Sequence, residues 1–403
     1  MKILYFGTVC DREGYDRLLQ DCHSKPSVAP LVFESALLDG MKKNAADVEI
    51  HSFPMIPTFP HCKLLCLGGH RETLPCGYEC RWLKTVNLPI LKQITRRIDA
   101  RRILKQWGKA NQGEGTILSY SIPPFLAKDI IKLGKKFGLK TIAIVPDLLQ
   151  DMYVNEDNRR ISTKLKKFYI KPALKMQGEY DGYVYLTEAM RHVVAPDKPY
   201  MVMEGIADVS RVQTPSAEGK AFPRAVMYAG MLHEKYGIMN LVDAFERLNA
   251  PNVELWLFGD GTAVPDIRKK AQKDPRIKYF GTLPRDEILA FERKATLLVN
   301  PRDPREPFTV YSFPSKTIEY MLSGTPLLTT RLPGIPQEYF EYVFSVEDNE
   351  VVNLALAMET ALSHDAGELH EMGVRAQRFI IEEKNACRQA AGIIAFQKEV
   401  KKF

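Results

Sequence analysis

Short apolar runs alternate with longer mixed segments throughout the first half of the chain. Six runs are rich in β-branched and aromatic residues and end in polar or turn residues, which predicts strands. They are Lys2 to Gly7, Val48 to Phe53, Thr116 to Tyr120, Thr141 to Val145, Gly182 to Leu186 and Tyr200 to Met203. Segments between them, such as Leu31 to Lys43 and Pro124 to Phe137, have the apolar spacing of helices. This alternation predicts a parallel sheet covered on both faces.

A polar segment rich in Gly, Pro and Ser follows at 204–223, and we interpret it as a linker. The pattern then restarts with six more expected strands: Ala225 to Ala229, Val253 to Phe258, Ile277 to Phe280, Leu297 to Asn300, Pro326 to Thr330 and Tyr342 to Val346. We therefore expect two doubly wound α/β domains, 1–205 and 206–385, and a C-terminal helix, 386–403, that crosses back to the N-terminal domain. Two such domains leave a cleft at the carboxyl ends of their strands.

Composition is consistent with two globular domains. The chain has 403 residues, of which 45% are hydrophobic and 26% are charged. No apolar run reaches the roughly 18 to 20 residues needed to span a bilayer, and MKILYFG resembles a strand more than a signal peptide. We expect a cytoplasmic protein that can lie at the inner face of the plasma membrane. The net charge of +7 comes from residues 1–205, so the two halves face different partners, and we expect no nucleic acid among them.

Cysteines are concentrated near the start of the chain, where six of the seven precede residue 81. We expect reduced thiols. The segment 61–80 holds Cys62, Cys66, His70, Cys76 and Cys80, which leaves a zinc site open, although three-residue gaps between cysteines are not specific for one. We expect this segment to be a mobile loop rich in Gly and Pro.

The stretch 306–330 combines a polar loop, a short helix from Lys316 to Ser323, a stop at Gly324 and an apolar strand. Unpaired backbone N–H groups at a helix start, with a cation beside them, can bind a diphosphate. Ser315 and Lys316 lie at that start, and Glu319 lies one turn along, where it can accept hydrogen bonds from sugar hydroxyls. The alternative is an ordinary helix start capped by Ser315.

Four other strand ends of the second half carry candidate ligand-binding residues. Gly230 allows close backbone approach, and Lys235 follows it within reach of an anionic oxygen. Gly259 and Gly261 end another strand, where a plain turn is the alternative. Gly281 ends a third strand, where a flat base can lie against the backbone. Arg302 ends the fourth, although an exposed Arg is usually only solvated.

Together these strand ends resemble the donor-nucleotide domain of GT-B-fold glycosyltransferases, in particular glycosyltransferase family 4 and its branch acting in capsular and exopolysaccharide synthesis. The segments that carry the resemblance are YAG..HEKYGI.NLVDAF, FGDG, YFGTLPRDEI, FPSKTIEYMLSGTPLLTT and LPGIPQEY, with VPDL and DGYVYLTEAM in the first half. The resemblance implies two Rossmann-like domains facing a central cleft. It also implies transfer of a sugar from a nucleotide sugar with retention at the anomeric carbon, generally without a metal.

The resemblance assigns roles to single positions. It implies that Glu319 binds ribose hydroxyls, that Lys235 binds the diphosphate and that Gly230 lies close to the donor phosphate. The expected donor-binding residues are Gly230, Gly259, Gly281, Leu283, Arg302, Tyr311, Phe313, Pro314, Ser315 and Glu319. Two positions depart from the family: Tyr311 replaces its first Glu, and Met231 replaces a common Arg, for which Lys316 or Arg302 is a candidate substitute.

The expected catalytic residues are Lys235, Lys316 and Asp147. A leaving nucleoside diphosphate gains negative charge, which a metal ion or fixed cations and N–H dipoles must stabilise. The chain has no Asp-x-Asp pattern, so we expect Lys235, Lys316 and the helix start to do this without a metal or other cofactor. Asp147, after an expected strand, is a candidate to orient or deprotonate the acceptor hydroxyl or to contact the donor sugar; alternatively, it caps a turn after Pro146.

The segment 91–109 is strongly basic and contains regularly spaced apolar residues. If helical, it places an apolar stripe beside a cationic surface, as expected for docking on anionic lipid headgroups. A solvated helix face is the alternative. A lipid-linked saccharide acceptor would require such membrane contact.

The leading hypothesis is a retaining glycosyltransferase that uses a nucleotide sugar, UDP rather than GDP, and extends a lipid-linked or oligosaccharide acceptor in surface polysaccharide synthesis. The transferred group would be a hexose or an N-acetylhexosamine. A nucleotide-sugar epimerase of the same fold and a catalytically silent scaffold of a polysaccharide assembly remain open. A dinucleotide-dependent oxidoreductase is disfavoured, because GTVCDREG after the first strand does not supply the G-x-G-x-x-G turn.

Overall fold

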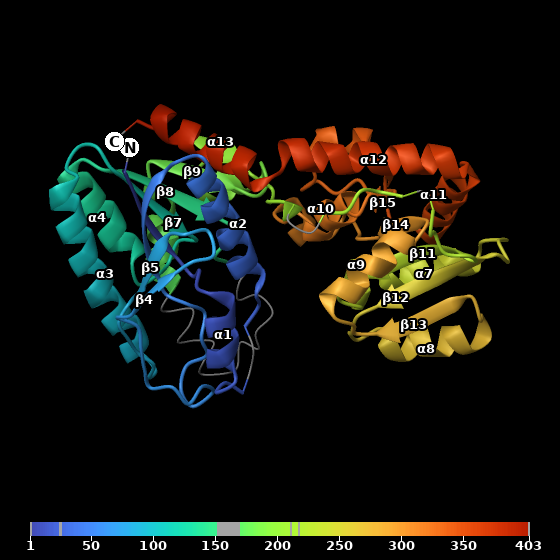
Figure 1. Cartoon of the computed structure of the whole chain (residues 1–403), viewed down its shortest axis with the longest axis horizontal. Helices are drawn as coiled ribbons and strands as arrows, with labels where there is room; N and C mark the ends of the chain where they lie inside the picture. Colours follow the sequence, from blue (N-terminus) through green and yellow to red (C-terminus); the bar gives the residue numbers. More distant parts are fainter. Residues whose placement is uncertain (1, 24–25, 151–169, 210–211, 217, 402–403) are drawn as a thin grey trace. The chain divides into compact units, whose positions relative to one another are not determined.

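The computed structural model describes residues 2–23, 26–150, 170–209, 212–216 and 218–401. The chain divides into two compact α/β units (Figure 1). Unit 1 comprises Met1–Ile206 and Ala386–Phe403, and unit 2 comprises Ala207–Asn385. None of the described helices combines the length and the apolar character needed to cross a membrane.

Unit 1 contains an eight-stranded sheet with the order β10-β9-β8-β7-β1-β2-β5-β4 in the described residues. Every neighbouring pair is parallel except β4 and β5. The strands of unit 1 are β1 (Lys2–Gly7), β2 (Asp47–Ser52), β3 (Cys66–Leu67), β4 (Arg71–Thr73), β5 (Glu79–Trp82), β6 (Thr85–Val86), β7 (Thr116–Tyr120), β8 (Lys140–Val145), β9 (Gly182–Tyr185) and β10 (Tyr200–Val202). All five residues of β7 are buried, as expected for a central strand covered on both faces.

Helices cover both faces of the unit 1 sheet (Figure 1). They are α1 (Arg12–Leu19), α2 (Ala29–Lys43), α3 (Leu91–Ala110), α4 (Ala127–Phe137), α6 (Met190–Val194) and α13 (Ala386–Glu399). α3 packs beside α4, whereas α13 packs on α2. The contact between α2 and α13 depends on Gly40, where a Cβ would lie 1.9 Å from the carbonyl oxygen of Ala386. The final helix is therefore part of unit 1.

The cysteine-rich segment is not the loop that the sequence led us to expect. β5 extends the main sheet parallel to β2, β4 pairs with β5, and β3 and β6 form a separate two-stranded sheet. Cys62 and Cys80 are fully buried in the core of unit 1. These strands escaped prediction because they are only two to four residues long and glycines separate them.

Unit 2 contains a six-stranded parallel sheet with the order β13-β12-β11-β14-β15-β16 in the described residues. Its strands are β11 (Arg224–Ala229), β12 (Val253–Phe258), β13 (Ile277–Gly281), β14 (Leu297–Asn300), β15 (Leu327–Thr330) and β16 (Phe344–Val346). Its α-helices are α7 (Ile238–Glu246), α8 (Val264–Lys273), α9 (Arg285–Lys294), α10 (Ser315–Leu322), α11 (Val351–Ser363) and α12 (Ala366–Glu383), and its 3-10 turns include η4 (Glu234–Tyr236) and η5 (Pro307–Val310).

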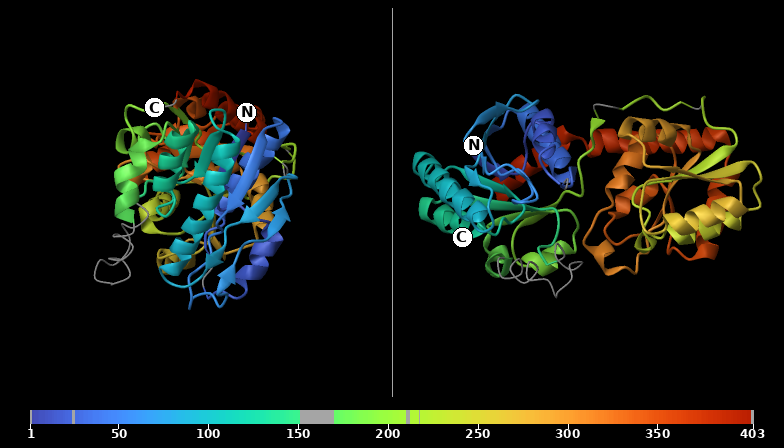
Figure 2. Two further views of the ribbon diagram at one scale, coloured as in Figure 1. Left: turned by 90° about the vertical axis from the view of Figure 1, so that its left-hand side faces the viewer. Right: turned by 90° about the horizontal axis from the view of Figure 1, so that it is seen from below.

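The unit 2 sheet lies between two helix layers (Figure 2). α7, α8 and α11 share one core with the sheet, and α9, α10 and α12 share the other. The order of strands reverses between β11 and β14 in unit 2, and between β1 and β7 in unit 1. Ligands of doubly wound sheets bind at the carboxyl ends of strands beside such a switch point.

Candidate donor-binding site

Three glycines at the carboxyl ends of adjacent strands of unit 2 form one continuous edge of backbone. The amide of Gly230, after β11, donates to the carbonyl of Phe258 at 3.0 Å, and the amide of Gly259, after β12, donates to the carbonyl of Gly281 at 2.8 Å. A Cβ at Gly259 would lie 1.8 Å from the carbonyl oxygen of Gly230, and its φ of +124° also disfavours a side chain. A Cβ at Gly281 would meet no atom within 4 Å, so space beside the backbone is open there. The structure thus joins three positions that the sequence indicated separately.

The cationic groups of Lys235 and Arg302 both lie close to the ring of Tyr236, at the switch point between β11 and β14. The Tyr236 ring centroid is 5.1 Å from Lys235 Nζ and 5.0 Å from the guanidinium carbon of Arg302. The ring of Phe308 lies 6.0 Å from the same guanidinium carbon. Within the described residues, neither cation forms an ion pair. Burial lowers the pKa of Arg302 from its ordinary value, as expected for a cation removed from water without a counter-ion.

Close backbone packing holds the two cation-bearing loops together. Gly237 follows η4, and a Cβ there would lie 1.9 Å from the carbonyl oxygen of Pro301. The hydroxyl of Thr330 donates to the carbonyl of Arg302 at 2.6 Å, which fixes the loop after β14. The site is therefore positioned by backbone contacts between elements far apart in sequence.

The start of α10 has no side-chain cap among the described residues. Ser315 is the first helical residue, Pro314 precedes the helix, and no side chain caps it. The alternative that Ser315 caps the helix is therefore wrong. Tyr320 fixes α10 to the end of β11, because its hydroxyl accepts from the Ala229 amide at 2.9 Å and donates to the Ala229 carbonyl at 3.1 Å. This contact keeps the free N–H groups near the glycine edge.

Lys316 and Glu319 form an ion pair one helical turn apart. Lys316 Nζ lies 2.5 Å from Glu319 Oε1, and about a quarter of each side chain is exposed. The charge of Lys316 is thus already paired, whereas Arg302 has no counter-ion among the residues that the structure describes. Of the two candidates to replace the Arg absent at Met231, Arg302 is better placed for a phosphate.

The loop before α10 rests on apolar packing. The ring of Phe313 lies 5.4 Å from that of Tyr339, and Phe313 and Leu283 both pack against the same core cluster. Tyr311 is half-buried. A Cβ at Gly334 would lie 2.5 Å from the carbonyl oxygen of Ser312, so the LPGIP segment supports this loop from behind.

Asp147 lies in unit 1, exposed after β8 and Pro146. The loop that bears it leaves the carboxyl end of the sheet, as the sequence predicted. Its proposed role toward the acceptor or donor sugar remains a prediction.

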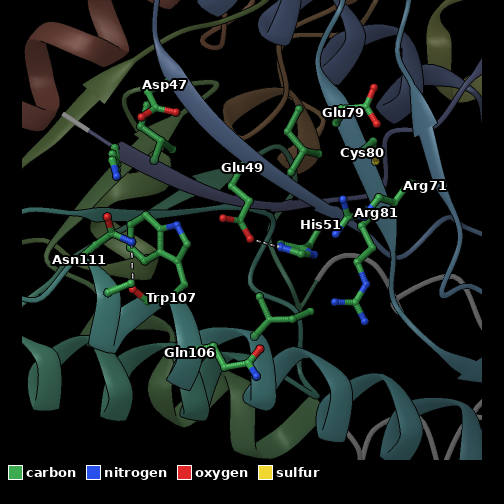
Figure 3. A pocket seen from close by; sticks show the side chains of 15 residues that line it. Asp47, Glu49, His51, Arg71, Glu79, Cys80, Arg81, Gln106, Trp107 and Asn111 are labelled. Atoms are coloured by element: carbon green, nitrogen blue, oxygen red, sulfur yellow. Dashed lines mark hydrogen bonds and ion pairs between the residues drawn. The ribbon is translucent and has the colours of Figure 1, made fainter.

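Unit 1 also contains a cavity of 650 Å³ between β2, β5 and the C-terminal half of α3 (Figure 3). Within it, His51 Nε2 lies 2.8 Å from Glu49 Oε1. The charged residues that line the cavity are three basic and three acidic ones: Lys2, Arg71, Arg81, Asp47, Glu49 and Glu79. None of the predicted site residues lines it, and its balanced charge favours no ionic ligand.

α3 does not carry the continuous apolar stripe that its sequence suggests. Its C-terminal apolar residues Ile103, Leu104 and Trp107 are buried in unit 1. Arg96 is buried as well and donates to the carbonyl of Pro54 at 2.9 Å. The cationic surface is therefore smaller than expected.

The N-terminal half of α3 does expose apolar side chains. Leu91, Ile94 and Ile98 are exposed, and Ile90, just before the helix, is 72% exposed. Phe59 and Leu65 are also exposed, and their backbones bond to Asn87, just before the helix. Arg97, Arg101, Arg102 and Lys105 are exposed on the same helix. We call this set of exposed residues the α3 surface.

All seven cysteines are free thiols. In the part of the chain that the structure describes, no three His, Cys, Asp or Glu side chains are grouped as metal ligands would be.

Comparison with known proteins agrees with this geometry. Residues 223–364, most of unit 2, match the family model described as Glycosyl transferases group 1. Unit 2 is a group 1 glycosyltransferase domain. No curated protein matches the chain in sequence. The glycosyltransferase match includes Gly230, Lys235, Arg302 and Glu319.

Solved structures show that the whole chain has the GT-B fold of two Rossmann-like units. Sucrose-phosphate synthase from Thermosynechococcus elongatus is 14% identical with a TM-score of 0.67, covering 99% of both chains. HepE from Anabaena in complex with UDP is 14% identical with a TM-score of 0.61, covering 99% of this chain and 100% of that one. The lipopolysaccharide outer core galactosyltransferase WaaB is 13% identical with a TM-score of 0.59, covering 99% of both.

Sequence reasoning missed two features of this glycosyltransferase domain. The Tyr236 ring that gathers the cations gave no signal, because an aromatic residue in a loop is ambiguous. Glu292 is fully buried beside Glu319, although charged helix residues are normally solvated. Its position four residues after Ile288, on the apolar face of α9, was the available signal.

Proposed function

We propose that this protein is a retaining glycosyltransferase that moves a hexose or N-acetylhexosamine from a nucleotide sugar to a lipid-linked or oligosaccharide acceptor. The observation that carries the proposal is the pair of cations without counter-ions, Lys235 and Arg302, beside the glycine edge and the open start of α10. Cations and N–H groups converging at a switch point suit a nucleoside diphosphate.

We expect the donor to bind this surface in one orientation. The diphosphate lies between Arg302, Lys235 and the N–H groups of α10. The base lies against the backbone at Gly281, where space is open, and the ribose hydroxyls reach the carboxylate of Glu319. UDP is the favoured nucleotide, and HepE of the same fold was solved with UDP and glucose.

The reaction forms a bond from the acceptor oxygen to the anomeric carbon and breaks the bond from that carbon to the diphosphate. The diphosphate leaves with the bonding electron pair, and its new charge is stabilised by Arg302, Lys235 and the start of α10. Asp147 is the candidate to receive the proton of the acceptor hydroxyl. Because fixed cations neutralise the leaving group, transfer should persist in a metal chelator; loss of turnover that added magnesium restores would contradict this.

A surface-polysaccharide acceptor is consistent with the α3 surface, and WaaB, named for the lipopolysaccharide outer core, shares the fold. Apolar side chains beside exposed Arg and Lys suit docking on an anionic lipid surface, where a lipid-linked acceptor is found. Docking there keeps the protein at the cytoplasmic face of the membrane.

Membrane docking can be tested with vesicles of phosphatidylcholine, with and without phosphatidylglycerol. Ile94→Ser combined with Ile98→Ser should reduce co-sedimentation with the anionic vesicles about tenfold, because two exposed apolar side chains are lost. Val352→Ser with Leu356→Ser is the matched control, since these residues are also exposed four positions apart on a helix. Equal losses in both double variants would contradict the assignment.

A screen of UDP and GDP sugars by thermal shift identifies the donor, since a bound ligand stabilises the folded state. Product analysis with the preferred donor then tests the function. Sugar transfer to an acceptor supports a transferase, and retention is read from the configuration of the product. Isomerisation of the donor without acceptor would indicate an epimerase, and the absence of both reactions would indicate a silent scaffold.

A further inference from the structure

Glu292 is a buried acid without a conventional partner. It is the only buried residue of α9, and its side chain is fully removed from solvent. Neither of its carboxyl oxygens accepts a hydrogen bond from a donor group among the described residues. An ionised carboxylate in such a place would be very unfavourable.

Charged groups from two helices surround this carboxyl group. From α10, the carboxyl of Glu319 lies within hydrogen-bonding reach, and Lys316 Nζ lies 4.0 Å from Glu292 Oε1. Tyr320 follows on α10, and Arg285 of α9 acts from the same helix as Glu292. Two carboxyl groups thus share one close ammonium group.

Lys316 decides which of the two carboxyl groups is ionised. Its ammonium is 2.5 Å from Glu319 but 4.0 Å from Glu292. Burial and the charge of Glu319 raise the pKa of Glu292 well above its ordinary value. Burial alone would also raise the pKa of Glu319, but Lys316 and the contact with Glu292 outweigh it, and the pKa of Glu319 lies below its ordinary value. The proton therefore resides on Glu292.

We propose that Glu292 is a protonated positioning residue, which donates a hydrogen bond to Glu319 and fixes that carboxylate for the ribose of the nucleotide. This assignment rests on the proposed function. Their contact requires a proton on one of the two groups, since two carboxylates can only accept, and the closer approach of Lys316 to Glu319 assigns that proton to Glu292. With Lys316 on one side and Glu292 on the other, the remaining lone pairs of Glu319 have a fixed direction toward hydroxyl groups.

The arrangement makes nucleotide affinity depend on pH. Because the pKa of Glu292 is raised, its proton is present through neutral pH and is lost only as the pH rises into the alkaline range. The two carboxylates then repel each other, and Glu319 loses its orientation. Nucleotide affinity should therefore decline on the alkaline side.

Calorimetric titration of UDP from neutral to alkaline pH tests this role with three variants. Glu292→Gln keeps a donor for Glu319, so its affinity should stay within about twofold of the parent at neutral pH and should not decline at alkaline pH. Glu292→Leu removes the donor and should bind UDP about tenfold more weakly. Glu287→Gln, exposed on the same helix, should keep the alkaline decline of the parent. If all four proteins bind UDP with the same pH profile, the inference is wrong while the proposed function stands.

A measurement on the protein without ligand tests whether Glu292 carries the proton. Infrared spectroscopy should show the C=O stretch of a protonated carboxylic acid at neutral pH in the parent and in Glu287→Gln, reduced in Glu292→Gln. An unreduced band in Glu292→Gln would overturn the assignment of the proton. If the parent binds neither nucleotides nor nucleotide sugars, the proposed function fails together with the role of Glu292 toward ribose, and the infrared band alone then decides where the proton lies.

Discussion

The carboxyl ends of β1 and β11 occupy equivalent places in their sheets. The backbone N–H groups near these two strand ends have different partners. In unit 1, the loop after β1 binds a carboxylate of its own chain: the amide of Thr8 donates to both oxygens of Glu34 at 2.9 Å. In unit 2, the amides of Gly230 and Gly259 donate to the carbonyls of Phe258 and Gly281, and no side chain among the described residues caps the start of α10. Unit 1 fills this place with a carboxylate of its own, whereas the start of α10 stays uncapped, and we propose that the diphosphate binds there.

Two of the buried glutamates, Glu34 and Glu292, show the same contrast. Glu34 accepts from the Tyr5 hydroxyl at 2.7 Å, from the Thr8 amide and from the Thr8 hydroxyl. Gly7 leaves room for it, since a Cβ there would lie 1.8 Å from Glu34 Oε2. Within the described parts of the chain, Glu292 has no donor and faces another carboxyl group instead. Glu34 is surrounded by donors, so its role is to stabilise the loop after β1. Glu292 lies beside a second acid, so its proposed role is to position Glu319.

The largest expected effect comes from removing each acid by the same substitution. Glu34→Leu should destabilise the protein by about 3 to 5 kcal/mol, because three donors, one buried and two partly buried, lose their acceptor. Glu292→Leu should leave the free energy of unfolding unchanged or higher, because no donor is orphaned. Urea unfolding of both variants measures the difference; equal destabilisation would show that Glu292 is held by contacts like those of Glu34.

The dependence of stability on pH should differ between the two sites as well. A raised pKa in the folded state means that folding takes up a proton, so the stability contributed is complete below the unfolded pKa and is lost as pH rises to the folded pKa. For Glu34 this loss is complete near pH 7, because burial raises its pKa to about 7. For Glu292 it continues to higher pH, with a slope of about 1.4 kcal/mol per pH unit.

Glu292→Gln isolates the pH-dependent contribution of Glu292 to the free energy of unfolding. Its stability relative to the parent should increase from mildly acidic to alkaline pH, and Glu287→Gln should show no such increase. Urea unfolding at a series of pH values provides the comparison. A constant difference between Glu292→Gln and the parent would mean that Glu292 is ionised in the folded protein.

Local sequence signals were enough to predict the parts of this site that local structure builds. Glycines at strand ends, the α10 helix and all six strands of unit 2 follow from composition and periodicity over a few residues. The ring of Tyr236 between Lys235 and Arg302, and the burial of Glu292 against α10, arise from packing between distant segments. The segment RDEILAFERK contains the exposed Glu287 and the buried Glu292, and the local sequence around each does not tell them apart. Only the fold brings Glu292 against its partner on α10.

Arg302→Met should produce the next largest effect, on the ligand site alone. UDP affinity should fall about 10- to 100-fold, since a charge-assisted contact to phosphate is lost from a partly buried place. Arg331→Met is the matched control: Arg331 also stacks on a ring, that of Phe340 at 4.6 Å, but is paired with Glu347 at 3.2 Å. Calorimetry that finds similar losses for both variants would remove Arg302 from the phosphate site.

Lys316→Met should produce the smallest effect and distinguishes two roles for this lysine. If Lys316 binds the diphosphate, as the sequence suggested, Lys316→Met should lower UDP affinity as much as Arg302→Met does. Because its ammonium is already held by Glu319 at 2.5 Å, we expect UDP affinity to fall only about two- to fivefold. Without Lys316, the two carboxyl groups share one proton more evenly, so the pKa of Glu319 rises and the loss of affinity should grow as pH falls.

Lys269→Met is the control for the loss of a helix ion pair, since Lys269 Nζ lies 2.8 Å from Asp266 on exposed α8. It should leave UDP affinity unchanged at every pH. A loss in Lys316→Met as large as that in Arg302→Met, and independent of pH, would mean that Lys316 contacts phosphate directly. The orientation of Glu319 would then depend on Glu292 alone, and Glu292→Leu should weaken UDP binding by more than the tenfold expected when both partners act.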